Sequence, residues 1–222
     1  MQVNVLYRPS QTIAQCWLAA NESVVAESGA MVGMSTNMQI QTQSGGVMSG
    51  LKRLFGGESF FRNTFTAAGG NGEILFATPL CGDMTTLDVG QTGWLLQNSA
   101  YVASTPGVNV ETVSGGVRGM FSGAGLFALQ CTGQGQVIVG AFGAIEQVAI
   151  DGTLVIDTGH LVAWQSSLQY KVVKSGSGWV ASMLSGEGLV CEFSGTGYAL
   201  VQSRNTQSYG EAIGKLLPPR QG

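Results

Sequence analysis

Residues 157–170, DTGHLVAWQSSLQY, decide the fold that the sequence predicts, because this stretch occurs three times. Residues 27–40, ESGAMVGMSTNMQI, match it position for position without a gap, and residues 97–110, QNSAYVASTPGVNV, form a fainter copy. Each copy consists of a polar residue, a turn and a short apolar strand. A strand-and-turn unit that is written three times predicts an all-β protein with internal repeats.

The similarity extends beyond this stretch. Residues 15–44 align with residues 145–174 at a constant offset of 130, and SGAGLF at 122–127 returns as SGEGLV at 185–190. We therefore expect three tandem β-sandwich or β-roll repeats in a single β domain, 1–205, divided at about 1–80, 81–143 and 144–205. Three copies in one chain suggest packing about a pseudo-threefold axis, as in a cyclic trimer.

Turns are expected where the copies carry small or polar residues. Asp151-Gly152 is a strong hairpin signal, and the glycines at 132–135 and 194–197 predict further turns. Glu27, Gln97 and Asp157 occupy one position in the three copies. Their side chains are expected to accept hydrogen bonds from backbone N–H groups of the turn.

Composition excludes some classes of function. Only 10% of the 222 residues are charged, 34 are glycine, and the formal net charge is -3. An acidic chain without a basic face does not predict nucleic-acid binding. The four cysteines are spaced too far apart for a CxxC site and are expected to be buried and unpaired. No signal peptide or membrane-spanning run is visible, which predicts a cytoplasmic protein.

Two short helices are expected. Residues 46–55, GVMSGLKRLF, place apolar residues on one face and two cations on the other. Residues 209–217 form the second, in which Ser208 and Glu211 have capping-box spacing and Pro218-Pro219 ends the helix. The chain after residue 205 is therefore predicted to be a C-terminal helix and tail, 206–222.

Catalytic chemistry is not predicted. His160 is the only histidine, so a multi-histidine metal site cannot be built, and the other two copies have Ala30 and Ala100 in its place. We interpret it as a hydrogen-bonded histidine beside a turn, with proton transfer as the alternative. Nucleophile-elbow and phosphate-loop motifs are absent. The sequence predicts no enzyme, no cofactor and no metal.

The remaining charged candidates are weaker. Glu58 and Glu187 occupy equivalent places and could act as paired carboxylates, although a solvated surface is the simpler interpretation. Arg62 and Arg204 could bind an anion, again with surface charge as the simpler interpretation.

The stretch 46–57 is the best candidate for a binding site. Its apolar face and its two cations suit docking on a protein partner or a membrane surface. An ordinary helix that closes one end of a barrel is the alternative. The residues that would dock are Val47, Leu51, Lys52, Arg53, Leu54 and Phe55.

Four motifs in this order resemble one known family. They are GLKRLFGGESFFRNTF at 50–65, SGAGLFAL at 122–129, DTGHLVAW at 157–164, and SGEGLV at 185–190 with QSRN at 202–205. Together they resemble the altered-inheritance-of-mitochondria twenty-four family, over essentially the whole chain. Gln202-Ser203-Arg204-Asn205 departs mildly from the family's usual Gln-Thr-Arg-Asn.

The resemblance implies a fold similar to that of the tryptophan RNA-binding attenuation protein, with three units about a pseudo-threefold axis. It implies no established activity or cofactor. Mitochondrial relatives are associated with inner-membrane organisation, a hint toward membrane or complex maintenance. We therefore expect a non-enzymatic scaffold or interaction protein that binds a protein partner or itself. The alternative is a small-ligand binder with a cleft between repeats.

Overall fold

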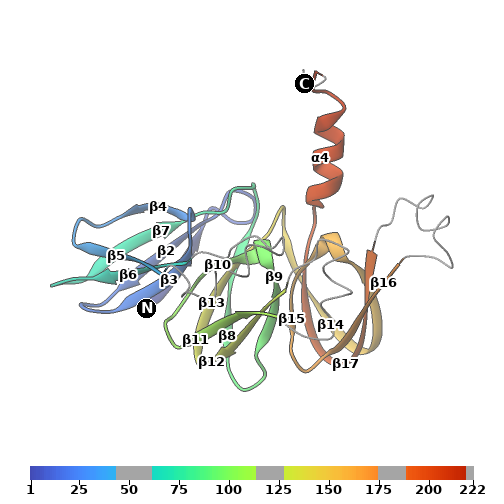
Figure 1. Cartoon of the computed structure of the whole chain (residues 1–222), viewed down its shortest axis with the longest axis horizontal. Coiled ribbons are helices and arrows are strands. Elements are labelled where there is room, and N and C mark those ends of the chain that lie inside the picture. The colour runs from blue at the N-terminus through green and yellow to red at the C-terminus, as the bar shows by residue number, and fades with distance from the viewer. Residues whose placement is uncertain (44–61, 114–127, 175–188, 219–222) are drawn as a thin grey trace.

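The computed structural model describes residues 1–43, 62–113, 128–174 and 189–218 (Figure 1). Most of these residues lie in β-strands, and one α-helix, α4, follows the last strand of the described part. The predicted all-β class with a short C-terminal helix is confirmed.

Where the connection between two strands is described it is short, and two of these connections contain the single-turn 3-10 helices η1 (Asn98–Ala100) and η2 (Thr158–His160). In chain order the strands are β1 (Gln2–Leu6), β2 (Ile13–Leu18), β3 (Ser23–Glu27), β4 (Met31–Met34), β5 (Met38–Gln43), β6 (Arg62–Ala67), β7 (Gly72–Phe76), β8 (Met84–Val89), β9 (Trp94–Gln97), β10 (Tyr101–Ser104), β11 (Val108–Thr112), β12 (Ala128–Gly133), β13 (Gly135–Gly140), β14 (Ile145–Asp157), β15 (Leu161–Gln165), β16 (Gln169–Lys174) and β17 (Leu189–Gln202).

Within the described ranges, the strands form three sheets. We call residues 1–80, 81–143 and 144–205 the first, second and third segments. The sheet β1-β2-β7-β4 lies within the first segment. The sheet β5-β6-β3-β10-β13-β8 joins the first segment to the second, and β11-β12-β9-β15-β17-β14, with β16 beside β17, joins the second to the third. Figure 1 shows the segments in an open row, with the first and the third at opposite ends. The predicted pseudo-threefold relation and the resemblance to the attenuation protein are not shown by this row and stay predictions.

The joint between the first two segments is an antiparallel pair of strands. β10 pairs with β3, so that Ala103 lies opposite Ala26 and Ser104 opposite Val25. The Tyr101 hydroxyl donates a hydrogen bond to the Val25 carbonyl oxygen at 3.1 Å. Burial raises the pKa of Tyr101 to about 12, so the phenol stays protonated and keeps this donor.

The joint between the second and third segments has the same form. β15 pairs with β9, with Ala163 opposite Leu96 and Trp164 opposite Leu95. All four side chains are buried. Because backbone hydrogen bonds and apolar burial coincide at both joints, neighbouring segments share continuous sheets.

Three apolar clusters fill the interior, and each contains residues from two neighbouring segments. The cluster of the first segment includes the edge-to-face pair of Phe65 and Phe76 together with Val102 and Ile138 of the second. The cluster of the third is built around Trp164 and Phe193, whose rings are 5.9 Å apart, and includes Leu95 of the second. Burial therefore crosses the segment boundaries.

The hairpin predicted at Asp151-Gly152 is wrong. β14 runs through both residues, and Gly152 lies opposite Gly195 in the equally continuous β17. Both glycines have positive φ, 102° and 113°. A turn signal on each of two paired strands lets the strands bend together without ending. The turn predicted at 194–197 is absent for the same reason, whereas Asn21, at the position equivalent to Asp151, does lie in a turn between β2 and β3.

The connections between segments interlock through one buried carboxylate. Asp83 is 2% exposed and accepts hydrogen bonds from Arg8 at 2.9 Å from Nε and 2.8 Å from Nη2. The Asp83 N–H donates to the carbonyl oxygen of Gly143 at 2.8 Å. A Cβ added to Gly82 would lie 1.8 Å from the carbonyl oxygen of Ala141. The two connections therefore lie backbone against backbone.

Helix α4 spans Thr206–Gly214, three residues earlier than predicted. Asn205 is its N-cap, and its side chain accepts from the N–H groups of Gln207 at 2.9 Å and Ser208 at 3.2 Å. The capping box predicted at Ser208 and Glu211 is wrong, because both residues lie inside the helix. Their spacing fits a cap, but the chain offers a better acceptor three residues earlier.

We predict that Gly82→Ala destabilises the protein by about 1–3 kcal/mol or more, because the new methyl group overlaps backbone that cannot move aside. Gly90→Ala is the matched control, since a Cβ there meets nothing within 4 Å. Urea unfolding of both variants measures the difference. Equal midpoints for the two variants would contradict the close approach of the connections.

We predict that Asn205→Ala frays α4 without unfolding the sheets. Loss of an N-cap costs about 1 kcal/mol, so amide hydrogen exchange in α4 should accelerate roughly fivefold. Ser208→Ala keeps the cap and should leave exchange in the first turn nearly unchanged. If Ser208→Ala accelerates exchange and Asn205→Ala does not, the cap assignment is wrong.

Candidate interaction sites

The docking residues predicted from the sequence lie outside the described residues. Val47, Leu51, Lys52, Arg53, Leu54 and Phe55 all fall between residues 43 and 62, as does the helix expected at 46–55. Glu58 and Glu187 also fall outside the described ranges. Docking by this stretch therefore stays a prediction.

His160 is held in a polar node at the base of α4. Its Nδ1 lies 2.7 Å from the backbone carbonyl oxygen of Gln202, so the ring nitrogen is the donor. The buried Gln202 side chain donates to the Gly159 carbonyl oxygen at 2.9 Å and accepts from the Phe142 N–H at 2.9 Å. The hydrogen-bonded turn histidine expected from the sequence is confirmed. Gln202 was not predicted to take part.

The predicted role of the shared polar position is confirmed in one copy. The Asp157 carboxylate accepts from the N–H of Gly159 at 2.7 Å. Gln97 occupies the same place before η1, but its side chain makes no capping hydrogen bond. A carboxylate is the stronger acceptor for a backbone N–H group.

The QSRN motif clamps the connection between the second and third segments. Ser203 and Ala144 exchange hydrogen bonds, from the Ser203 N–H to the Ala144 carbonyl oxygen at 3.0 Å and from the Ala144 N–H to Ser203 Oγ at 2.9 Å. The N–H of Arg204 donates to the carbonyl oxygen of Phe142 at 3.2 Å. This contact involves only the backbone of Arg204, so anion binding by its side chain stays a prediction. Arg62, the other predicted anion ligand, interacts with the Tyr101 phenol at the first joint.

Three of the four cysteines are buried as expected. Burial raises the pKa of Cys16, Cys131 and Cys191 to about 12, so these thiols stay protonated. The expectation fails for Cys81, which is exposed in the connection that follows the first segment. No disulfide forms among the four, all of which lie in described ranges.

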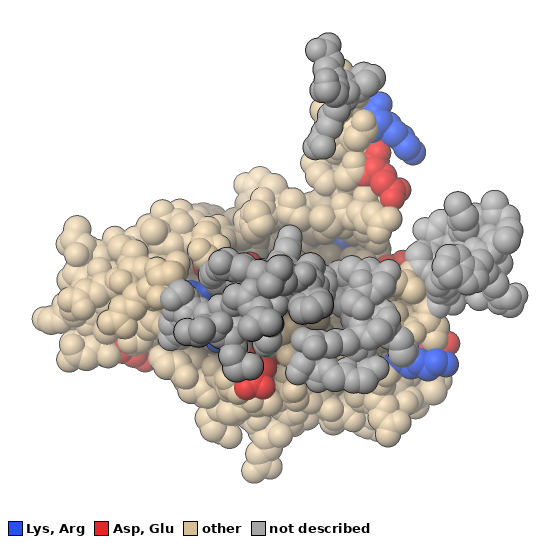
Figure 2. Space-filling view, viewed as in Figure 1, with Lys and Arg blue, Asp and Glu red and all other residues tan. Residues whose placement is uncertain are grey.

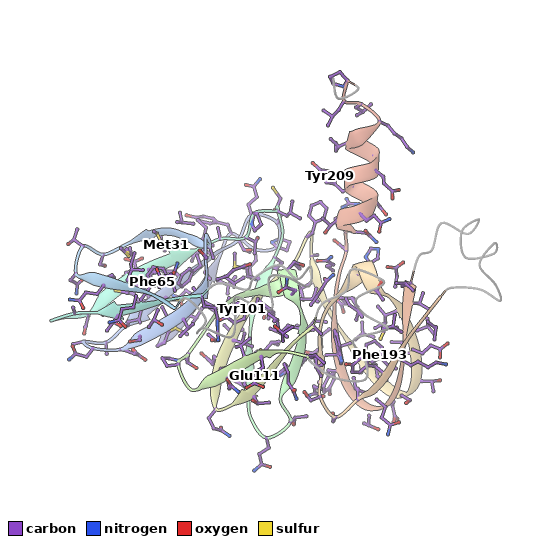
Figure 3. All side chains as sticks on the ribbon, viewed as in Figure 1. Met31, Phe65, Tyr101, Glu111, Phe193 and Tyr209 are labelled. Atoms are coloured by element: carbon purple, nitrogen blue, oxygen red, sulfur yellow. The ribbon has the colours of Figure 1, made fainter. Side chains whose placement is uncertain are left out.

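The clearest apolar surface is on α4 and the residues just after it. The helix stands away from the sheets in Figure 1, and none of its residues is buried. Leu216 is 81% exposed and Leu217 62% exposed, and Tyr209 and Ile213 are also exposed. The ring of Tyr209 contacts Phe142 edge-to-face at 5.1 Å, at the foot of the helix (Figure 3). We call Tyr209, Ile213, Leu216 and Leu217 the helix surface.

Two sheet edges also carry exposed apolar residues. β4 exposes Met31, Val32 and Met34, and β14 exposes Val155. Figure 2 shows few charged residues on the face in view, so most of its described surface is uncharged. Both edges lie at the ends of their sheets, with no partner strand on the outer side among the described strands.

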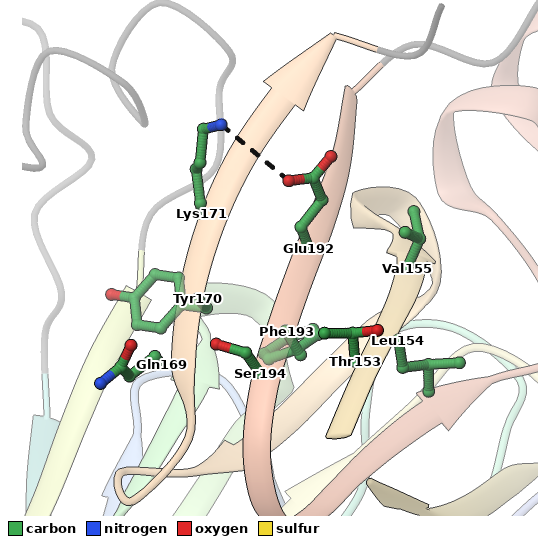
Figure 4. Close-up of a pocket in the computed structure, with 9 residues that line it drawn as sticks. All are labelled: Thr153, Leu154, Val155, Gln169, Tyr170, Lys171, Glu192, Phe193 and Ser194. Carbon is green, nitrogen blue, oxygen red and sulfur yellow. Dashed lines mark ion pairs between the residues drawn. The ribbon is translucent and has the colours of Figure 1, made fainter. Parts of the chain in front are cut away.

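An open depression of about 520 Å³ lies on the third segment (Figure 4). Its walls come from β14, β16 and β17, and it includes the ion pair of Lys171 with Glu192 at 3.9 Å. Both of these side chains are at least half exposed, so the pair contributes little energy. The depression lies within one segment and not between segments, where a ligand cleft was expected.

Metal sites and membrane-spanning helices are two further classes of functional element. In the described ranges, no group of three or more His, Cys, Asp or Glu side chains is placed to hold a metal ion. None of the helices in those ranges is long and apolar enough to cross a membrane.

Comparison with known proteins supports the family resemblance. A family described as mitochondrial biogenesis AIM24 matches residues 3–204. An uncharacterised protein of Streptococcus pyogenes serotype M6 is 30% identical over 207 residues, which cover 88% of this chain and 83% of that protein. A crystal structure of a Streptococcus pyogenes protein superposes with a TM-score of 0.82 at 25% identity, covering 97% of this chain and 99% of that one. The chain therefore belongs to the mitochondrial-biogenesis AIM24 family.

Proposed function

We propose that this protein is a non-enzymatic scaffold that binds a protein partner through the helix surface. The observation that carries the proposal is a helix of nine residues with no buried residue and an exposed apolar stripe. Helices shorter than about 12–15 residues are marginal in water unless an apolar face is packed. A partner that covers the helix surface would supply that packing.

The size of the helix surface supports the same proposal. Burying one large apolar side chain contributes roughly 1.5–3 kcal/mol. Four such side chains in one stripe therefore offset a large part of the cost of association, and contacts around the stripe would have to supply the rest. The cap at Asn205 and the contact of Tyr209 with Phe142 hold the start of the helix, so the stripe is presented in a defined direction.

The sheets form the rigid part of the proposed scaffold. We propose that the three segments are versions of one unit, as the recurring strand-and-turn stretch indicates. Membership in the family adds the finer suggestion that the partner belongs to membrane or complex maintenance. The stretch 46–57 remains a second candidate surface of the same kind.

Small-ligand binding is the alternative function. The depression on β14, β16 and β17 has a volume in the range of ligand pockets, about 300–1,000 Å³. It is open to solvent, and ligand sites usually enclose most of the ligand. The scaffold proposal is therefore the better supported of the two.

The test is capture of cross-linked partners from the protein's own cells with three tagged full-length chains. We expect Ile213→Asp/Leu217→Asp to recover at least about tenfold less partner than the wild type, since losing one buried apolar side chain already costs about that factor. Lys215→Gln, between the two substituted positions, is the control and should recover the wild-type amount.

Equal partner recovery by the wild type and the double variant would contradict the proposal. The same three proteins are also sedimented with phospholipid vesicles. Sedimentation that needs Ile213 and Leu217 would assign the helix surface to a membrane instead of a protein.

A further inference from the structure

We propose that the protein associates head to tail with further copies of itself, by pairing the outer edge of β14, residues 153–157, with β4 of the next copy. The inference deepens the proposed scaffold function by naming one partner, a second copy of this chain. It uses the sheet edges and not the helix surface, so the two proposals can fail separately.

The first observation is that β4, β10 and β15 are paired in the same way. Each strand lies antiparallel to the last strand of its own segment, β7, β13 or β17. Each has a register shift at the same place, between its first and third residues. The shifts fall at Met31/Gly33, Tyr101/Ala103 and Leu161/Ala163. The three strands therefore have equivalent shapes and equivalent outer edges.

The second observation is that the outer edges of β10 and β15 are each paired with a strand of the neighbouring segment, and that the two pairs have the same register. The third residue of β10 lies opposite Ala26 of β3, and the third residue of β15 lies opposite Leu96 of β9. Ala26 and Leu96 each directly precede the shared polar position, Glu27 or Gln97. The residue that precedes it in the third copy is Ile156, on β14.

The third observation is that each end of the row has one strand edge of the kind that forms these joints, without a described strand that would complete the pair. β4 has no strand on its outer side and β14 has none on its own, among the described strands. The two edges lie at opposite ends of the molecule in Figure 1, so they do not meet within one chain. Each segment boundary inside the chain uses the joint, whereas no described strand uses it at either end of the row.

Exposure shows which side chains a partner would cover. All four residues of β10 and the first four of β15 are buried, whereas Met31, Val32 and Met34 of β4 are exposed. On the opposite edge, Leu95 of β9 is 7% exposed and its counterpart Val155 of β14 is 58% exposed. Val25 of β3, the other counterpart of Val155, is partly buried. The end strands thus expose apolar residues at positions that are buried or partly buried in the inner joints.

The inner joints fix the register of the proposed contact. Ile156 of one copy would lie opposite Gly33 of the next, and Val155 opposite Met34. The Ile156 side chain would have room beside Gly33, since an added Cβ at Gly33 meets nothing within 4 Å. The new sheet would run β16-β17-β14 in one copy and β4-β7-β2-β1 in the next, seven strands as in the longest internal sheet.

The paired parts of the two edges carry little of the usual protection against pairing. Exposed edges in monomeric proteins commonly carry lysine, proline or inward charge. Residues 153–156 are Thr-Leu-Val-Ile and residues 31–34 are Met-Val-Gly-Met, without a charge or a proline. Asp157, at the end of the contact, is equivalent to Glu27 at the end of β3 in the first joint. The register shift of β4 also occurs in β10 and β15, whose outer edges are paired. The two surfaces differ from each other, so the contact is heterologous and builds a ring or an open chain of copies.

The test is sedimentation velocity of the full chain over a range of protein concentrations. The wild type should grow beyond its 23.0 kDa monomer as concentration rises. Val155→Lys and Met34→Lys should each remain monomeric, because either charge would be buried in the joint. Both positions are exposed, and circular dichroism checks that the variants are folded.

A mixture of the two variants gives the sharpest result. Val155→Lys retains an intact β4 edge and Met34→Lys retains an intact β14 edge. An equimolar mixture should therefore form dimers and nothing larger, although each protein alone is monomeric. Cysteines at both positions in a Cys81→Ser background should form a ladder of disulfide-linked copies, and Val155→Cys with Ile40→Cys on β5 should not.

A wild type that stays monomeric at every concentration would overturn the proposal, as would variants that associate like the wild type. The Ile213→Asp/Leu217→Asp chain separates the two proposals. It should lose partner capture and keep self-association. If it loses self-association while Val155→Lys keeps it, the helix surface is the self-contact and the edge proposal is wrong.

Discussion

A strand edge carries a row of backbone N–H and C=O groups that need partners, and this requirement governs how the segments are held together. β3 finds its outer partner in β10 of the next segment, and β9 finds its own in β15. Each segment thereby completes its neighbour's sheet. The apolar clusters follow the sheets across the same boundaries, so the joints are at once hydrogen-bonded and buried.

Buried polar groups then fix the connections between segments. Asp83 holds the first connection through Arg8 and through the backbone of Gly143. Gln202 holds the second through Phe142 and Gly159, and His160 donates to its carbonyl oxygen. An unpaired group at either place would carry a large desolvation cost, so these contacts specify one arrangement of the connections.

Much of this architecture could be predicted from the sequence because it depends on periodicity. Recurring polar, turn and apolar positions indicated an all-β chain and placed a turn at Asp157 correctly. Local sequence could not show whether the chain turns back at Asp151-Gly152, since this depends on the pairing of Gly152 with Gly195, in a strand about 40 residues away. Local spacing likewise favoured Ser208 as a cap, although the side chain of Asn205 was better placed.

The candidate sites were less predictable, because whether an apolar side chain is covered depends on which strands become edges. Met31 and Leu161 occupy equivalent places in copies of one stretch, yet only Leu161 is buried, since the copies differ in the neighbours they have.

The chain belongs to a family that is described by mitochondrial biogenesis. The proposed scaffold role agrees with a described surface that offers strand edges and an exposed helix. If the end strands repeat the inner joints between copies, both edges must become covered when the protein is concentrated. Hydrogen exchange of the backbone amides of β4 and of residues 153–157, measured at low and at high protein concentration, tests this most directly. We expect both sets of amides to become protected together as concentration rises, while those of α4 do not. Unchanged exchange at both edges in the concentrated protein would contradict the pairing of the end strands.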